Sequence, residues 1–159
     1  MNVSNSITPL KGEKLTDKRP KPLWNDTDWK MVEEHVNRLQ TRIAKAVKQE
    51  KWNLVKRLRY LLTNSFYAKL LAVKRVTQNR GKRTAGIDGV KWVTQNSKMN
   101  AALKLSDVKY KAKPLRRVYI SKQGTTKKWP LGIPTMYDRA MQALYALALQ
   151  PIAETTSDP

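Results

Sequence analysis

Residues 113–154 read KPLRRVYISKQGTTKKWPLGIPTMYDRAMQALYALALQPIAE and contain the main signals for the fold class. The segment from Pro114 to Ile120 is rich in β-forming residues, Gly124 marks a turn, and residues 129–134 have the pattern of a returning strand. The stretch therefore predicts a β-hairpin with a basic tip. Residues 136–153 are largely apolar and predict a helix. We expect part of this helix to be buried by residues that the chain does not contain.

The half of the chain before this stretch has helical periodicity. From Asn25 onward, apolar side chains recur at steps of three and four, which places them on one stripe: Trp29, Val32, Val36, Leu39, Ile43 and Val47. A second stripe begins near Lys51 and continues, after an expected break at residues 63–65, to Val73. Two helices joined by residues 49–51 are expected to pack as an antiparallel pair.

Between the helices and the hairpin lies the segment NRGKRTAGIDG, residues 79–89, which interleaves three glycines with cations. This composition predicts a loop whose glycines let the backbone approach a ligand closely. Asp88 stands between Gly86 and Gly89 and is better interpreted as a turn residue than as a ligand. A short helix is expected between Asn96 and Leu105. The predicted fold class is α+β and mainly helical.

Composition restricts the possible functions of the 159-residue chain. The formal net charge is +20 and the sequence pI is near 10.4, which is typical of nucleic-acid binders. There is no cysteine, and His35 is the single histidine, so disulfides, Cys zinc sites and His clusters are excluded. No apolar run suits a membrane span or a signal peptide, so we expect no membrane partner and a cytoplasmic location, bacterial or organellar.

The cations form two runs that contain no acid. Residues 51–83 contain ten Lys or Arg, and residues 109–128 contain eight. A solvated face normally mixes both signs, so these runs favour contact with phosphates, whose neutralisation releases counterions. The residues expected to bind RNA or a template are Lys74, Arg75, Arg80, Lys82, Arg83, Gly86, Gly89, Arg116, Arg117, Lys127 and Lys128.

Strand geometry and the aromatic residues refine this expectation. Arg116 and Arg117 are adjacent on a strand and should point to opposite faces, so one of them should pack on a helix or pair with an acid. Trp52, Trp92, Trp129, Tyr110 and Tyr119 have rings on which bases could stack. Trp29 and Trp52 lie on helical stripes and are more typical of a core. Trp129, on the basic hairpin, is the best stacking candidate.

The strings LLTNSFYAKLLAVKRVTQNRGKRTAGIDGV, from Leu61, and PLGIPTMYDRAMQAL, from Pro130, are specific. Together with DWKMVEEHVNRLQTRIAKAVKQEKW, from Asp28, they closely resemble the N-terminal part of group II intron-encoded reverse transcriptases, or maturases, over roughly residues 25–158. The resemblance implies the fingers of a right-hand polymerase. It also implies that residues 86–89 lid the template, that the hairpin from Leu115 to Ile133 reaches over template and nucleotide, and that intron RNA and a DNA primer-template are partners.

The resemblance also assigns individual residues. Lys122 occupies the family's Ile-Pro-Lys position and is implied to contact a nucleotide phosphate. The resemblance assigns a less specific role, as fingers residues near the template or the core, to Arg116, Arg117 and Arg139. Ser121 stands where the family usually has Pro, and Trp129 where it usually has Arg. Lys127 or Lys128 would have to supply the charge of that missing arginine.

The carboxylates that hold two metal ions in such polymerases lie in a palm with a Tyr-Ala-Asp-Asp turn, which this sequence lacks. We therefore expect no catalytic residue, no metal site and no cofactor in this chain, with Mg²⁺ bound only in the complete enzyme, and a palm and thumb polypeptide as a partner. Asp138, at the head of the last helix, is interpreted as a first-turn charge or an internal pair.

The expected organisation is a flexible basic tail (1–24), a helical N-terminal extension with the template-lid loop (25–106), and the fingers hairpin and helix (107–159). The composition of the tail is as compatible with a disordered segment of no specific function as with an RNA contact. Three hypotheses remain open for the chain: an RNA-binding fingers fragment, a stand-alone RNA-binding or splicing-assistance module, and an inactive remnant.

Overall fold

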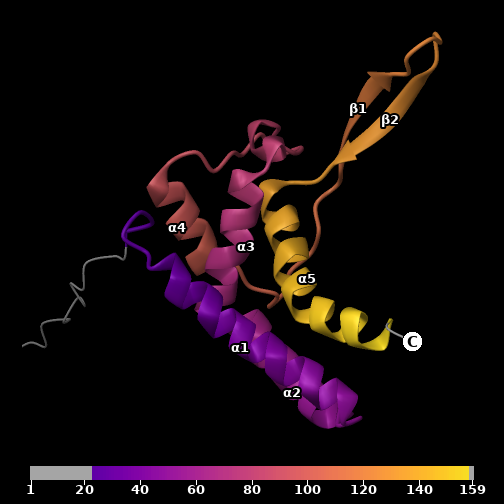
Figure 1. Ribbon diagram of the computed structural model, residues 1–159. Coiled ribbons are helices and arrows are strands. Elements are labelled where there is room, and N and C mark those ends of the chain that lie inside the picture. The colour runs from indigo at the N-terminus through magenta and orange to yellow at the C-terminus, as the bar shows by residue number, and fades with distance from the viewer. Residues whose placement is uncertain (1–22, 158–159) are drawn as a thin grey trace, which may run out of the picture.

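The computed structural model describes residues 23–157 and contains five α-helices and one β-hairpin within them (Figure 1). The helices are α1 (Trp29–Lys48), α2 (Trp52–Asn64), α3 (Phe66–Gln78), α4 (Gln95–Lys104) and α5 (Met136–Thr156). A short 3₁₀ helix, η1, covers Arg80–Arg83, and the strands β1 and β2 cover Arg116–Ser121 and Lys128–Ile133. The α+β, mainly helical prediction is confirmed.

The helix boundaries follow local signals. Asp28 caps α1 by accepting a hydrogen bond from the backbone N–H of Met31 at 3.1 Å. The connection to α2 passes through Glu50, whose φ is 54°, and α1 packs against α2 as predicted. The expected break after α2 is real, because Ser65 has extended backbone angles and separates α2 from α3.

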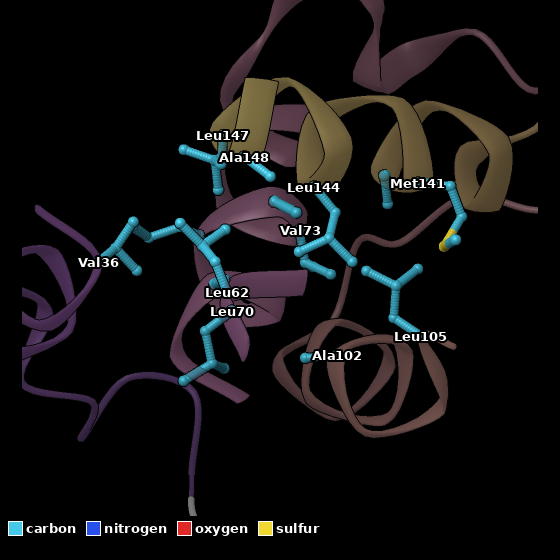
Figure 2. Close-up of a cluster of buried hydrophobic side chains, with 14 of the residues drawn as sticks. Val36, Leu62, Leu70, Val73, Ala102, Leu105, Met141, Leu144, Leu147 and Ala148 are labelled. Carbon is cyan, nitrogen blue, oxygen red and sulfur yellow. The ribbon is translucent and has the colours of Figure 1, made fainter. Parts of the chain in front are cut away.

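The core is formed mainly where α3 and α5 pack together and α1 and α4 cover them. Figure 2 shows Val73 of α3 beside Leu144 of α5, with Leu105 close by. Leu144 and Leu147 are each 2% exposed, whereas Leu149 is 45% exposed. Leu144 and Leu147 are therefore enclosed by α3 and its neighbours, whereas the expectation that residues outside the chain bury part of α5 stays a prediction for Leu149.

Pro151 lies inside α5 and removes the backbone N–H that would bond to the carbonyl of Leu147. The side-chain amide of Gln40, on α1, donates a hydrogen bond of 2.7 Å to that carbonyl instead. Figure 1 shows α5 bending toward its C-terminal end, as a proline in a helix explains. Gln40 thus replaces a lost helical bond and joins α1 to α5.

Residues 1–22 of the predicted tail lie outside the described residues. Trp24, which that prediction placed in the tail, is 7% exposed and packs edge-on against Trp29, with ring centroids 4.8 Å apart. The interpretation of Trp52 as a core residue is wrong, because its side chain is 48% exposed. Within residues 23–157, no helix combines the length and apolar character needed to cross a bilayer.

Candidate nucleic-acid interface

The β-hairpin projects from the helical body, and its strands make their main contacts with one another (Figure 1). The strands are antiparallel, with Arg116 opposite Ile133 and Ser121 opposite Lys128. Nearly every residue of both strands is exposed. The tip reverses direction through Gly124, whose φ is 77°. The hairpin is therefore an arm whose two faces are both free to contact a ligand.

The register divides the hairpin into two chemically different faces. Directly opposed residues share a face, so Tyr119 lies with Pro130, flanked by Arg117 and Lys128. The other face carries the apolar side chains Val118, Ile120, Trp129 and Leu131. Trp129 is 59% exposed, and the Nζ atom of Lys122 lies 5.4 Å from its ring centroid. Lys122 and Trp129 therefore form a cation–π pair near the tip.

Arg116 and Arg117 do point to opposite faces, as predicted from their adjacency. The accompanying expectation, that one of them packs on a helix or pairs with an acid, is wrong. Both are exposed, and among the described residues neither forms an ion pair. The reason is that the hairpin projects from the helices, and the α5 side chain whose charge reaches Arg116 is Arg139, a cation rather than an acid.

The basic η1 segment is fastened to the start of α5 by Arg139. Its guanidinium donates hydrogen bonds to three backbone carbonyls, those of Pro134 (3.0 Å), Gly81 (2.8 Å) and Thr84 (2.5 Å). Burial and the nearby charge of Arg116 lower the pKa of Arg139. Arg139 thus holds the loop in place, while the side chains of η1 itself remain exposed.

The turn after η1 is packed against the protein at Gly86, whereas residues 87–89 are exposed. A Cβ atom on Gly86 would lie 2.6 Å from the Cα of Thr135, so the expectation that Gly86 offers its backbone to a ligand is wrong. Gly89 is exposed, with φ at 68° and open space around it. Asp88 accepts a hydrogen bond from the N–H of Val90 at 3.1 Å, which agrees with its interpretation as a turn residue.

Asp138 is a buried carboxylate in the first turn of α5, as the sequence indicated. It accepts hydrogen bonds from the hydroxyls of Thr135 (2.6 Å) and Tyr110 and from the N–H of Lys113 (3.3 Å). Burial raises the pKa of Asp138, but these hydrogen bonds outweigh burial and the net pKa is lowered. Burial and then Asp138 raise the pKa of Tyr110 to about 12. Through Tyr110 and Lys113, this network anchors the chain that leads into β1.

Lys74 and Arg75 are adjacent but differently placed. The Nζ atom of Lys74 lies 2.9 Å from a carboxylate oxygen of Glu33 and 4.5 Å from the ring centroid of Trp29. The prediction that Lys74 binds RNA is therefore not supported by its position, because α1 already neutralises it. Arg75 is exposed beside a hollow of about 520 Å³ that Arg139 and Gly81 also line.

Sequence reasoning missed Lys91 and Lys98 and, although it included Trp92 among the rings on which bases could stack, preferred Trp129. The fold brings Lys91, Trp92 and Lys98 together with Lys82 and Arg83 around a hollow of about 320 Å³. Lys91 and Lys98 lie outside the two acid-free runs, so charge counting along the chain did not select them. Within residues 23–157, no group of three or more His, Asp or Glu side chains is placed to hold a metal ion.

Comparisons with known proteins give a consistent result. The family described as the N-terminal domain of reverse transcriptase matches residues 24–105. The group II intron-encoded protein LtrA of Lactococcus lactis subsp. cremoris is 34% identical over 98 residues, which cover 60% of this chain and 16% of that protein. The protein YkfC of Escherichia coli is 30% identical over 126 residues, which cover 76% of this chain and 32% of that protein. The chain therefore spans less than a third of the matched relatives' length.

Proposed function

Since the chain belongs to the reverse-transcriptase N-terminal domain family, as the N-terminal region of a group II intron reverse transcriptase or maturase, we propose that it grips RNA for such an enzyme. The observation that carries this proposal is a set of exposed cations with no carboxylate in ion-pair contact among the described residues: Arg80, Lys82, Arg83, Arg116, Arg117, Lys122, Lys127 and Lys128. Such a surface attracts a polyanion and repels itself without one.

The hairpin is the part of this surface that extends farthest from the body, and we assign it to the template. In this role it is the hairpin of the fingers region, residues 107–159, which also includes α5. The turn at residues 86–89, in the 25–106 extension, is the lid, with Gly86 as its packed base and Gly89 exposed. We propose that Lys122 contacts a nucleotide phosphate. The cation–π pair of Lys122 with Trp129 supports this role, because the ring holds the ammonium group near the tip.

We assign the polymerase chemistry to another part of the enzyme. The sequence has no paired carboxylates and no Tyr-Ala-Asp-Asp turn, so Mg²⁺ and nucleotidyl transfer are left to a palm that this chain would assist. Primer extension on an RNA template by the pure chain should stay at background. Metal-dependent DNA synthesis by the pure chain would refute this assignment.

RNA binding is tested by reversing charge at the hairpin tip. Lys127→Glu/Lys128→Glu should weaken binding of a structured RNA, measured by fluorescence anisotropy across a salt series. The matched control is Lys30→Glu/Lys45→Glu, which makes the same charge change on α1. Each lost phosphate contact should reduce the slope of log K against log salt by about 0.9. A flat salt response of the unmodified chain, or equal losses in both variants, would contradict the proposal.

A stand-alone RNA-binding or splicing-assistance module is the second candidate function. It is favoured by the core, in which Leu144 and Leu147 are buried within this chain. The exposed Leu149 and the apolar face of the hairpin favour the fragment instead. Mixing the chain with a polypeptide that carries the palm of the same family separates the two. Restored primer extension identifies a fragment, whereas RNA binding without restored extension identifies a module.

A further inference from the structure

Four successive segments of the chain, within residues 77–98, line the hollow of about 320 Å³ beside η1. They are the end of α3, η1 itself, the connection that follows it, and α4. The lining residues are Thr77, Lys82, Arg83, Lys91, Trp92, Val93 and Lys98. Four of these seven residues are cations and none is acidic, so the hollow is positively charged. Its volume lies at the lower end of the range for small-molecule sites, about 300–1,000 Å³.

The charge in the hollow is not neutralised by the part of the protein that the structure describes. Within residues 23–157, no carboxylate forms an ion pair with Lys82, Arg83, Lys91 or Lys98. The Nζ atom of Lys98 lies 6.0 Å from the ring centroid of Trp24, so its position is guided by an aromatic face rather than by an acid. Cations gathered around one concave space repel one another, and a bound phosphate relieves that repulsion.

Trp92 gives the hollow a firm aromatic wall. It is half-buried and packs against the core, so its ring is held in position. Trp92 also lines a separate hollow with Tyr110 and Asp138. An aromatic face beside cations is the arrangement with which proteins bind single-stranded nucleic acid, because the cations take the phosphate and the ring stacks on the base. A base inside a duplex has both faces covered by its neighbours, whereas an unpaired base has a face free to stack on this ring.

We propose that this hollow binds one unstacked nucleotide of single-stranded RNA, with its phosphate among Lys82, Arg83, Lys91 and Lys98 and its base against Trp92. The inference rests on the proposed RNA-binding function and specifies which form of RNA this surface selects. It assigns to η1 and α4 a role that the hairpin, an open arm without such a hollow, does not perform.

The test compares the affinity of the full chain for a labelled single-stranded oligoribonucleotide with its affinity for a blunt duplex of the same sequence. Lys91→Ala/Lys98→Ala removes two cations from the hollow, and Lys30→Ala/Lys45→Ala removes two from α1 as the matched control. Thermal melting verifies that each variant is folded. We expect the first variant to lose about tenfold in single-strand affinity, and its salt slope to fall by about 0.7 per lost phosphate contact. Duplex affinity should fall no more than in the control.

The aromatic part of the proposal is tested separately. Trp92→Phe keeps a ring and should retain most single-strand affinity, whereas Trp92→Leu should lose about tenfold. If the wild-type chain binds RNA and the Lys91/Lys98 variant behaves like its control, the hollow is not the site and the broader function stands. If the wild-type chain binds no RNA, both proposals fall. If the variant loses binding of free adenosine monophosphate but keeps RNA binding, the hollow takes free nucleotides and the inference is overturned.

Discussion

Gly86→Ala tests whether the glycine turn is a packing feature or a ligand contact. The new Cβ would lie 2.6 Å from the Cα of Thr135, 2.7 Å from its backbone N and 2.9 Å from the carbonyl carbon of Pro134. Carbon atoms in optimal contact are about 3.5–4.0 Å apart, so the overlap is near 1 Å. The opposing atoms are backbone and cannot rotate away. They are also held by the cap of α5 and by the Arg139 hydrogen bond to Pro134.

Overpacking of this kind typically costs about 1–3 kcal/mol, and the rigid neighbours place Gly86→Ala at about 3 kcal/mol. For a chain of 159 residues, each kcal/mol shifts Tm by about 2–4 °C, so Tm should fall by about 6–12 °C. Urea unfolding followed by circular dichroism measures the free energy, and a thermal scan measures Tm. A variant with unaltered unfolding and weakened RNA binding would refute the packing argument and restore Gly86 as a ligand contact.

Two neighbouring glycines supply the controls. At Gly81, an added Cβ meets just the Nη1 atom of Arg139, at an ordinary 3.5 Å, so Gly81→Ala should change stability by no more than about 0.5 kcal/mol. At Gly89, an added Cβ meets nothing, but φ is 68°, so Gly89→Ala should cost about 1–2 kcal/mol from backbone strain alone. The three substitutions therefore separate steric overlap from strain.

Three further predictions concern stability. Gln40→Ala should lower the free energy of unfolding by about 1–3 kcal/mol, measured in urea, because the Leu147 carbonyl loses its partner; an unaltered value would show that water replaces the amide. Burial and then Asp138 raise the pKa of Tyr110 to about 12, whereas the pKa of an unfolded tyrosine is about 10. The Tyr110 hydroxyl therefore contributes fully to the free energy of unfolding below a pH of about 10, and this contribution is lost as the pH rises toward 12. Tyr110→Phe should flatten this part of the alkaline urea profile, and a profile like that of the wild type would contradict the assignment. Trp52→Lys should shift stability by less than about 0.5 kcal/mol in the same assay, since the side chain is 48% exposed, and a larger loss would make Trp52 a core residue after all.

Local signals in the sequence located the α-helices and the hairpin, but not the 3₁₀ helix η1, which lies at Arg80–Arg83 where a loop was predicted. Apolar periodicity located the helices, and the extended Ser65 lies within the expected break. The β-forming segment and Gly124 located the hairpin, since turn chemistry and strand propensity act over a few residues. Trp52 shows the limit of periodicity, which places a side chain on a stripe but does not decide whether a neighbouring helix covers that end of it.

The sequence by itself determined that the chain is strongly basic, that its cations form acid-free runs, and that its strings resemble those of group II intron reverse transcriptases. Which of these cations are paired with an acid depends on the three-dimensional fold. Lys74 and Arg80 belong to the same run, yet Lys74 is paired with Glu33, 41 positions away, while the side chain of Arg80 is exposed on η1. The fold also decided that Lys91 and Lys98 share one hollow. The physical reason is that charge accumulates along a sequence, whereas pairing and burial depend on distances in space that folding sets.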